Sequence, residues 1–210
     1  MKKKLIPGSG LYAVIDREVC ANRPPAEIAK DCVSAGVKII QLRDKTEDVG
    51  SFYNDALLIR RITKKKALFI INDRADIAKL VGADGLHIGQ ADLPLSAARA
   101  LLGPHKILGL SCHSLKEALS AQREGVDYIS IGPIFKTPTK AQYRPVGLRL
   151  LGESRRRVKI PIVAIGGINK NNIEHVRKVN INMIAVVRAI CKARNIKKAV
   201  ALLSPINHRP

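Results

Sequence analysis

Basic and acidic side chains stand just after several short apolar runs of this sequence. The run KIIQL is followed by Arg43 and Lys45, a planar guanidinium and an ammonium of the kind that binds phosphate. The run LFIIN ends at Asn72 and is followed by Asp73, and GLHIG is followed by Asp92. Mg²⁺ prefers one or two carboxylates together with water and substrate phosphates. These residues therefore predict a magnesium–diphosphate site.

Two of these assignments have structural alternatives. Arg43 is equally suited to an internal salt bridge, for example with Asp73. Asp92 is placed to cap a helix that begins near Leu93.

A serine and two histidines lie near these groups. Ser111 ends the run ILGLS and is suited to donate to a phosphate, while Ser114 is placed to cap the next helix. A Ser–His–Asp triad through Ser111 and His113 is the alternative, but the sequence lacks the GxSxG elbow. His87 stands among apolar residues, which favours a packed core histidine over a catalytic one.

The elements that must position these side chains alternate regularly along the chain. The apolar runs are near-continuous (LFIIN, IPIVAI, MIAVV), as in parallel strands covered on both faces. Strands are expected at 11–16, 37–43, 67–73, 85–89, 106–113, 127–133, 160–168 and 183–187. Helices are expected at 24–35, 48–65, 75–81, 93–102, 115–124, 146–157, 171–179 and 189–203. This α/β pattern predicts one (β/α)8 TIM barrel over 1–210, with 1–10 as a basic N-terminal extension.

In such a barrel the active residues lie at the carboxyl ends of the strands and in the loops that follow. The long polar segment after the sixth run carries Thr137, Pro138, Thr139 and Lys140. Long loops in compact domains are usually functional lids, so residues 136–145 are expected to form an active-site loop.

The seventh and eighth runs end in a second candidate anion site. Gly166 and Gly167 leave backbone amides unobstructed, and Arg188 stands where the last helix is expected to begin. A glycine loop beside a helix start forms the phosphate site that recurs in this fold. A tight turn is the alternative explanation of the double glycine.

Composition excludes several classes of protein. The chain carries 37 Lys+Arg against 17 Asp+Glu, a formal net charge of +20, yet 46% of its residues are hydrophobic, which excludes disorder. No apolar run approaches the roughly 18–20 residues that span a bilayer, and the N-terminal apolar stretch is broken at Pro7. We expect no membrane partner, a cytoplasmic location, and buried reduced thiols at the four scattered cysteines.

The basic excess raises nucleic acid as a partner, because clustered Lys and Arg attract phosphates without sequence specificity. The sequence has no basic patch interleaved with aromatics and no recognisable nucleic-acid-binding motif. A solvated basic surface with no specific nucleic-acid partner is therefore preferred.

Six segments of this chain resemble the thiamine phosphate synthase family: QLRDK, NDRADIA, GADGLHIGQADLP, GLSCHS, GPIFKTPTK and IVAIGGI. The resemblance extends from LYAVID to VVRAI, nearly the whole chain. It implies a Mg²⁺-dependent transferase that joins 4-amino-5-hydroxymethyl-2-methylpyrimidine diphosphate to a thiazole phosphate. The products would be thiamine phosphate and pyrophosphate.

The resemblance also implies residue roles. The pyrimidine diphosphate would be held by Gln41, Leu42, Arg43, Asp44, Lys45, Asn72, Ser111 and Lys140. Magnesium would be ligated by Asp73 and Asp92. The thiazole phosphate would be held by Thr137, Pro138, Thr139, Gly167, Val187 and Arg188. The residues expected to be catalytic are Arg43, Lys45, Ser111 and Lys140.

Two positions depart from the family pattern, and three functions compete with the synthase. Arg188 replaces the usual Ser, and Lys136 replaces a residue that is commonly small or Pro. The sister thiazole tautomerase carries a catalytic His where this chain has Pro133 and lacks the NDR and TPTK sets, so the synthase is favoured. The two remaining competitors are a nucleic-acid-binding barrel and a barrel that binds only the product. The sequence leaves open whether the chain forms a homo-oligomer.

Overall fold

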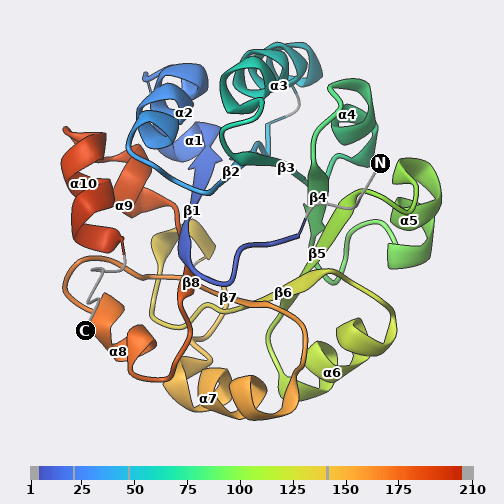
Figure 1. Cartoon of the computed structure of the whole chain (residues 1–210), viewed down its shortest axis with the longest axis vertical. Coiled ribbons are helices and arrows are strands. Elements are labelled where there is room, and N and C mark those ends of the chain that lie inside the picture. Colours follow the sequence, from blue (N-terminus) through green and yellow to red (C-terminus); the bar gives the residue numbers. More distant parts are fainter. Residues whose placement is uncertain (1–4, 21, 47, 141, 205–210) are drawn as a thin grey trace.

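Eight parallel strands close into a barrel in the computed structural model, which describes residues 5–20, 22–46, 48–140 and 142–204. Each strand pairs with the next in sequence, and β8 pairs with β1 (Figure 1). The strands are β1 (Gly10–Asp16), β2 (Ile39–Arg43), β3 (Leu68–Asn72), β4 (Gly85–Ile88), β5 (Ile107–Cys112), β6 (Tyr128–Ile131), β7 (Ile162–Ile165) and β8 (Met183–Val186). Each lies within or beside a predicted apolar run, so the predicted TIM barrel is confirmed.

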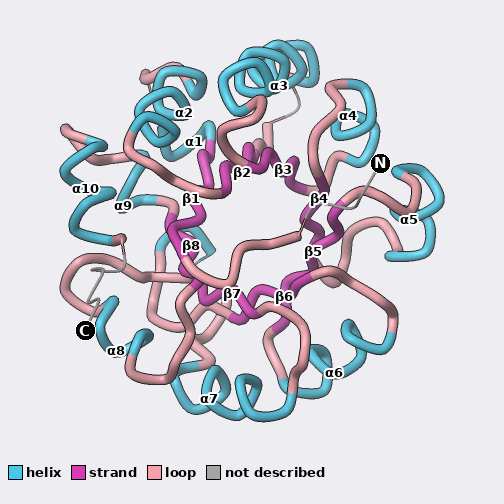
Figure 2. Tube along the Cα trace, in the orientation of Figure 1, coloured by secondary structure: helices cyan, strands magenta, loops and turns pink. Residues whose placement is uncertain are grey.

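Helices form an outer ring around the strands (Figure 2). They are α1 (Arg17–Cys20), α2 (Pro25–Ser34), α3 (Val49–Thr63), α4 (Ala75–Leu80), α5 (Leu95–Leu102), α6 (Leu115–Arg123), α7 (Gly147–Arg157), α8 (Ile173–Arg177), α9 (Arg188–Cys191) and α10 (Ile196–Leu203). A 3-10 helix, η1 (Pro138–Lys140), lies in the loop after β6.

The structure differs from the predicted helices in two places. The short helix α1 directly follows β1 and is not among the predicted helices. The helix predicted at 189–203 is two helices, because the side chain of Asn195 accepts a hydrogen bond from the Lys198 amide (2.9 Å) and so caps a new start. Ser114 caps α6 as predicted, with its hydroxyl accepting from the Glu117 amide at 3.2 Å.

Alternate residues of each strand face two different apolar layers. Ile40 and Ile71 belong to the cluster between strands and helices, while Ile39 and Ile70 belong to the cluster inside the barrel. The side-chain period of two in a strand requires this division. Both faces are therefore apolar, which explains why the strand sequences do not alternate. Full burial of one such isoleucine contributes roughly 1.5–3 kcal/mol.

The segment before β1 crosses the barrel opening (Figure 1). Ile6 is buried there and packs in the inner cluster with Tyr12 and Ile39. This contact closes the amino end of the barrel, so the carboxyl end is the open one. The lysines of the predicted basic extension, residues 2–4, lie outside the described residues.

Candidate functional site

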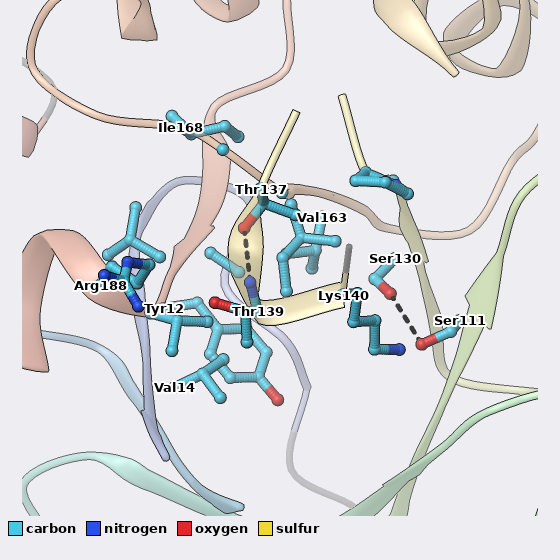
Figure 3. A pocket seen from close by; sticks show the side chains of 18 of the residues that line it. Tyr12, Val14, Ser111, Ser130, Thr137, Thr139, Lys140, Val163, Ile168 and Arg188 are labelled. Atoms are coloured by element: carbon cyan, nitrogen blue, oxygen red, sulfur yellow. Dashed lines mark hydrogen bonds between the residues drawn. The ribbon is translucent and has the colours of Figure 1, made fainter. Parts of the chain in front are cut away.

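A cavity of about 440 Å³ opens at the carboxyl ends of the strands. It lies between the inner faces of the strands and the loop that carries η1 (Figure 3). The predicted site residues that line it are Gln41, Arg43, Asn72, Ser111, Thr137, Pro138, Thr139, Lys140, Gly167, Val187 and Arg188. The structure therefore brings together residues from sequence positions 41 to 188 at one opening.

Five predicted residues are not among those that line the cavity: Lys45, Asp73 and Asp92 form a cluster beside it that is described below, and Leu42 and Asp44 point elsewhere. Leu42 is fully buried in the cluster between strands and helices. Asp44 accepts a hydrogen bond from Arg17 (2.6 Å) and another from the Thr46 amide (2.8 Å). Leu42 and Asp44 both flank the cavity residue Arg43, but their side chains serve the surrounding scaffold.

Two ion pairs set the positions of the basic side chains after β2. Arg43 pairs with Asp16 at the end of β1, and Lys45 pairs with Asp73 after β3. The suggested salt bridge between Arg43 and Asp73 is therefore not formed. Arg43 pairs with Asp16 instead, because these two residues lie opposite each other in the register of β1 and β2. The Arg43 side chain is largely buried beside Asp16, whereas the Lys45 side chain remains 45% exposed.

Asp73 and Asp92 lie side by side next to Lys45. Burial raises the pKa of Asp73, the neighbouring carboxyl of Asp92 raises it further, and Lys45 opposes both effects. Burial alone would raise the pKa of Asp92, but hydrogen bonds from Asp73 and the Gly89 amide bring it below its usual value. Asp92 accepts from Gly89 N at 2.7 Å, while α5 begins after Pro94, so Asp92 is not the helix cap.

The backbone of Asp73 is itself unusual. Its φ is 61°, a left-handed conformation that costs a non-glycine residue roughly 1–2 kcal/mol. A hydrogen bond from the Asp73 amide to the His87 carbonyl (2.8 Å) holds this turn in place. In this conformation the Asp73 carboxylate lies against Asp92 and Lys45. Strained backbone conformations of this kind are concentrated at functional sites.

This pair of carboxylates suits a divalent cation that takes its remaining ligands from water and from a bound phosphate group. Among the described ranges, no group of three or more His, Cys, Asp or Glu side chains is arranged to hold a metal by itself. Two adjacent carboxylates leave most positions of an octahedral ion to water and phosphate oxygens, which is the arrangement Mg²⁺ prefers. The donor set therefore fits Mg²⁺ bound together with a diphosphate.

Lys140 adds a third cation from η1. Burial lowers its pKa, the cation Arg43 lowers it further, and the carboxylate of Asp73 opposes the shift. Its ammonium also lies 5.5 Å from the centre of the Tyr143 ring. Figure 3 shows Lys140 extending toward Ser111 and Ser130. A partly desolvated ammonium at this place gains the most from an anionic ligand.

A chain of hydrogen-bonded polar side chains runs along and just behind the floor of the cavity. Gln41 Nε2 donates to the Tyr12 hydroxyl (2.5 Å), which lies 2.9 Å from the Tyr128 hydroxyl. The Tyr128 hydroxyl lies 2.9 Å from His87 Nδ1, and His87 Nε2 lies 3.0 Å from Ser111 Oγ. Burial lowers the pKa of His87 to about 3, so the imidazole is neutral. We call these five residues the polar relay.

Three residues at or just behind the cavity floor are not among those predicted from the sequence: Tyr12 and Ser130, which line the cavity, and the fully buried Tyr128. The available signal was that two of the four tyrosines stand inside predicted strands of a chain with 3% aromatic residues. His87 is buried as predicted, but it also joins Ser111 to the relay. His113 instead bonds the Gly132 carbonyl at 2.6 Å, so the alternative triad of Ser111 and His113 is not formed.

The opposite side of the cavity is built from backbone and hydroxyl groups. Gly167 has φ +67°, and a Cβ there would lie 2.6 Å from the Lys136 carbonyl oxygen. The Thr139 amide donates to Thr137 Oγ1 at 3.4 Å (Figure 3). Thr139 Oγ1 is buried and has no hydrogen-bond partner within the described part of the chain. Arg188 is exposed at the first position of α9. This side offers donors to a second anion.

The closed barrel, with a cavity at the carboxyl ends of its strands, defines the architecture of a TIM-barrel enzyme that acts on small molecules. The model of the thiamine monophosphate synthase family matches residues 11–190, and this chain belongs to that family. It is 42% identical to a thiamine-phosphate synthase of Clostridium acetobutylicum over 197 residues, 93% of each chain. A second relative, the thiamine-phosphate synthase of Clostridium tetani, is 42% identical over 90% of this chain and 91% of the relative.

The solved structures agree with the sequence relatives. A thiamine phosphate pyrophosphorylase from Pyrococcus furiosus superposes with a TM-score of 0.84 at 38% identity, covering 92% of both chains. The family, the synthase activity and the transferase class predicted from the sequence are confirmed. Within the described residues, no helix is both long and apolar enough to cross a bilayer.

Proposed function

We propose that this chain joins 4-amino-5-hydroxymethyl-2-methylpyrimidine diphosphate to a thiazole phosphate at the carboxyl end of its barrel, releasing pyrophosphate. The observation that carries the proposal is the grouping of three cations and two carboxylates beside one cavity that also has a second, glycine-lined anion site. A reaction with two phosphorylated substrates needs two such sites.

The diphosphate belongs on the side formed by β2 to β5. Arg43, Lys45 and Lys140 supply positive charge, and Ser111 supplies a hydroxyl at the cavity floor. Asp73 and Asp92 would hold Mg²⁺, which neutralises charge on the diphosphate when it is bound. Lys45 already neutralises Asp73 in this structure, so it is free to turn to the diphosphate when the cation takes over that carboxylate.

The thiazole phosphate belongs on the opposite side. Gly167 allows the close approach of a ligand to the backbone, and Thr139 Oγ1 is a buried hydroxyl that a phosphate oxygen would satisfy. Pro138 and Val187 complete this wall, and the backbone at Val187 and Arg188 supplies further amides. Residues 136–140 of the proposed active-site loop line the cavity, and Tyr143 farther along the loop stacks on His113 after β5; residue 141 lies outside the described residues.

The proposed reaction is a substitution at the methylene carbon of the pyrimidine. The bond from that carbon to the diphosphate oxygen breaks, and its electron pair leaves on the diphosphate. The lone pair of the thiazole nitrogen then forms the new carbon–nitrogen bond. The ring amino group donates electron density to the cationic carbon, so no general base is required. Arg43, Lys45 and Lys140 stabilise the leaving charge, and the loop excludes water that would capture the cation.

The proposed setting is the cytoplasm. Cys20, Cys32, Cys112 and Cys191 are all buried and unbridged, which suits a reducing compartment. Small phosphorylated molecules are the proposed partners, and the basic surface away from the cavity is proposed to be solvated.

Incubation of the protein with both phosphorylated substrates and Mg²⁺ tests the proposal. We expect equal amounts of thiamine phosphate and pyrophosphate, with no product in the presence of EDTA. Binding of thiamine phosphate without turnover would instead support a barrel that binds only the product. Retention of RNA at physiological salt, with no release of pyrophosphate, would support a nucleic-acid-binding barrel.

A further inference from the structure

The polar relay connects two residues to which substrate contacts are assigned, Gln41 on β2 and Ser111 on β5. Tyr12, Tyr128 and His87 join them across the barrel interior; Tyr12 and His87 also reach the cavity wall, whereas Tyr128 lies behind it. Tyr12 and Tyr128 are at most 2% exposed, and His87 is 6% exposed. Water therefore has little access, and each proton in the relay must be shared between these side chains.

The backbone is shaped to admit this relay. Gly109 on β5 lies in register with both His87 on β4 and Tyr128 on β6. A Cβ at Gly109 would lie 2.1 Å from Tyr128 Cζ and 2.5 Å from His87 Nδ1. Only glycine leaves room for the contact between the tyrosine hydroxyl and the imidazole.

The orientation of the Gln41 amide sets the direction of the relay. In this structure Gln41 Nε2 faces the Tyr12 hydroxyl and donates to it, and with that orientation Tyr12 passes its own proton on to Tyr128. Tyr128 then donates to His87 Nδ1, which places the single imidazole proton on Nε2. His87 Nε2 then directs its proton to Ser111 Oγ, which at 3.0 Å is nearer to it than Ser130 Oγ at 3.3 Å, and Ser130 donates to Ser111 Oγ at 3.4 Å.

We propose that the polar relay is a directional device in which Tyr12, Tyr128 and His87 are positioning residues for the two substrate-facing ends. With the relay in this direction, Ser111 Oγ already accepts two hydrogen bonds, so its proton is left for an anion in the cavity. At the far end, Gln41 presents its Oε1 to a donor such as a ring amino group. The identity of these ligands rests on the proposed function, while the direction of the relay rests on the orientation of the Gln41 amide.

The opposite direction is the physical alternative. If Gln41 accepted from Tyr12, every proton would shift, and His87 would carry its proton on Nδ1. Ser111 would then donate to His87 Nε2 and turn its lone pairs toward the diphosphate, which repels an anion. The two directions thus differ at an atom that NMR detects, the protonated nitrogen of His87.

The tautomer of His87 tests the proposal by ¹⁵N NMR on the intact protein with histidine labelled, with and without Mg²⁺ and inorganic pyrophosphate. The His87 signals are assigned by their loss in His87→Gln. We expect a neutral ring with the proton on Nε2 when pyrophosphate is bound. A proton on Nδ1 in that complex overturns the proposal.

Gln41→Glu tests the coupling along the relay. At a pH where the introduced carboxyl is ionised it only accepts, so it should reverse the relay and move the His87 proton to Nδ1. Adding Tyr128→Phe cuts the relay, and this double variant should keep the proton on Nε2. Gln122→Glu on α6 adds the same charge outside the barrel and should leave the tautomer unchanged. An unchanged tautomer in folded Gln41→Glu overturns the proposal.

Binding of magnesium pyrophosphate gives a second readout. Loss of one hydrogen bond to a charged group costs about 1.5–3 kcal/mol, so Ser111→Ala should weaken binding at least tenfold. In Gln41→Glu the same truncation should have no further effect, because the serine proton is already turned away; equal effects in both backgrounds overturn the proposal. Failure of the unmodified protein to bind pyrophosphate counts against the proposed function, whereas the tautomer response to Gln41→Glu is measured without any ligand.

Discussion

The two sides of the cavity are built by different means. On the side of β2 to β5, charged side chains provide the binding groups, and ion pairs such as Arg43–Asp16 and Lys45–Asp73 hold them in place. On the side of β6 to β8, the backbone around Gly167 and the hydroxyls of Thr137 and Thr139 provide the donors, while Lys140 of η1 extends toward the charged side. The first side can lose a side chain and keep its shape, whereas the second cannot gain one without moving its backbone.

This difference predicts different consequences of mutation. Changes on the charged side should reduce turnover while leaving the barrel folded. Changes on the glycine side should reduce substrate binding and stability together. The expected effects decrease from the metal site, through Lys140 and Gly167, to Arg188.

Removal of the metal site should have the largest effect. In Asp73→Ala the remaining carboxylate of Asp92 cannot hold the cation alone, and loss of about 4 kcal/mol of charge stabilisation corresponds to roughly a thousandfold loss of kcat/KM. The unmodified protein in EDTA should lose activity to the same level. Asp76→Ala, which removes an exposed carboxylate paired with Arg74, is the matched control and should retain activity. Full activity in EDTA would show that no divalent cation is needed.

Truncation of Lys140 should have the second largest effect. Lys140→Ala removes one preorganised cation from the leaving diphosphate, which should lower kcat about a hundredfold. Thermal unfolding should be nearly unchanged, because Lys140 ends the short helix η1 in a loop and belongs to no strand of the barrel. Lys116→Ala on the exposed face of α6 is the control. Near-normal turnover of Lys140→Ala would remove this residue from the mechanism.

The glycine side should respond in both binding and stability. Gly167→Ala places a Cβ 2.8 Å from Phe135 Cβ, and it requires alanine to adopt the left-handed backbone conformation of Gly167. The free energy of unfolding should therefore fall by about 1–2 kcal/mol or more. The KM for the thiazole phosphate should rise about tenfold, the equivalent of one lost hydrogen bond to a charged group. Gly125→Ala has φ +78° but open space around it, so it should lose stability with KM unchanged. Equal KM values in the two variants would contradict a phosphate site at Gly167.

Arg188 should have the smallest effect. Its side chain is exposed at the start of α9, where solvent screens its charge. Arg188→Ser, which introduces the residue expected from the family resemblance, should raise the KM for the thiazole phosphate by about threefold, or about 0.7 kcal/mol. A lower KM in the variant would show that Arg188 crowds this site instead.

The same division explains what the sequence could predict. Continuous apolar runs at regular intervals specified the closed barrel, and charged residues at strand ends specified the side formed by Arg43, Lys45, Asp73 and Asp92. The pairing of these charges could not be predicted, because it depends on which strands are neighbours in register. Arg43 bonds Asp16 for that reason.

The interior of the barrel was the least predictable part. Tyr12 and Tyr128 lie 116 positions apart, and their hydroxyls meet only because closure of the sheet brings β1 and β6 to opposite sides of one lumen. The role of Gly109 is equally hidden, since its neighbours are set by strand register rather than by spacing in the chain.

A crystal structure of the protein with Mg²⁺ and pyrophosphate tests the division of the cavity most directly. The pyrophosphate should lie among Arg43, Lys45, Lys140 and Ser111, with the cation between it and the carboxylates of Asp73 and Asp92. Pyrophosphate bound at Gly167 and Thr139, with the two carboxylates free of metal, would contradict this division.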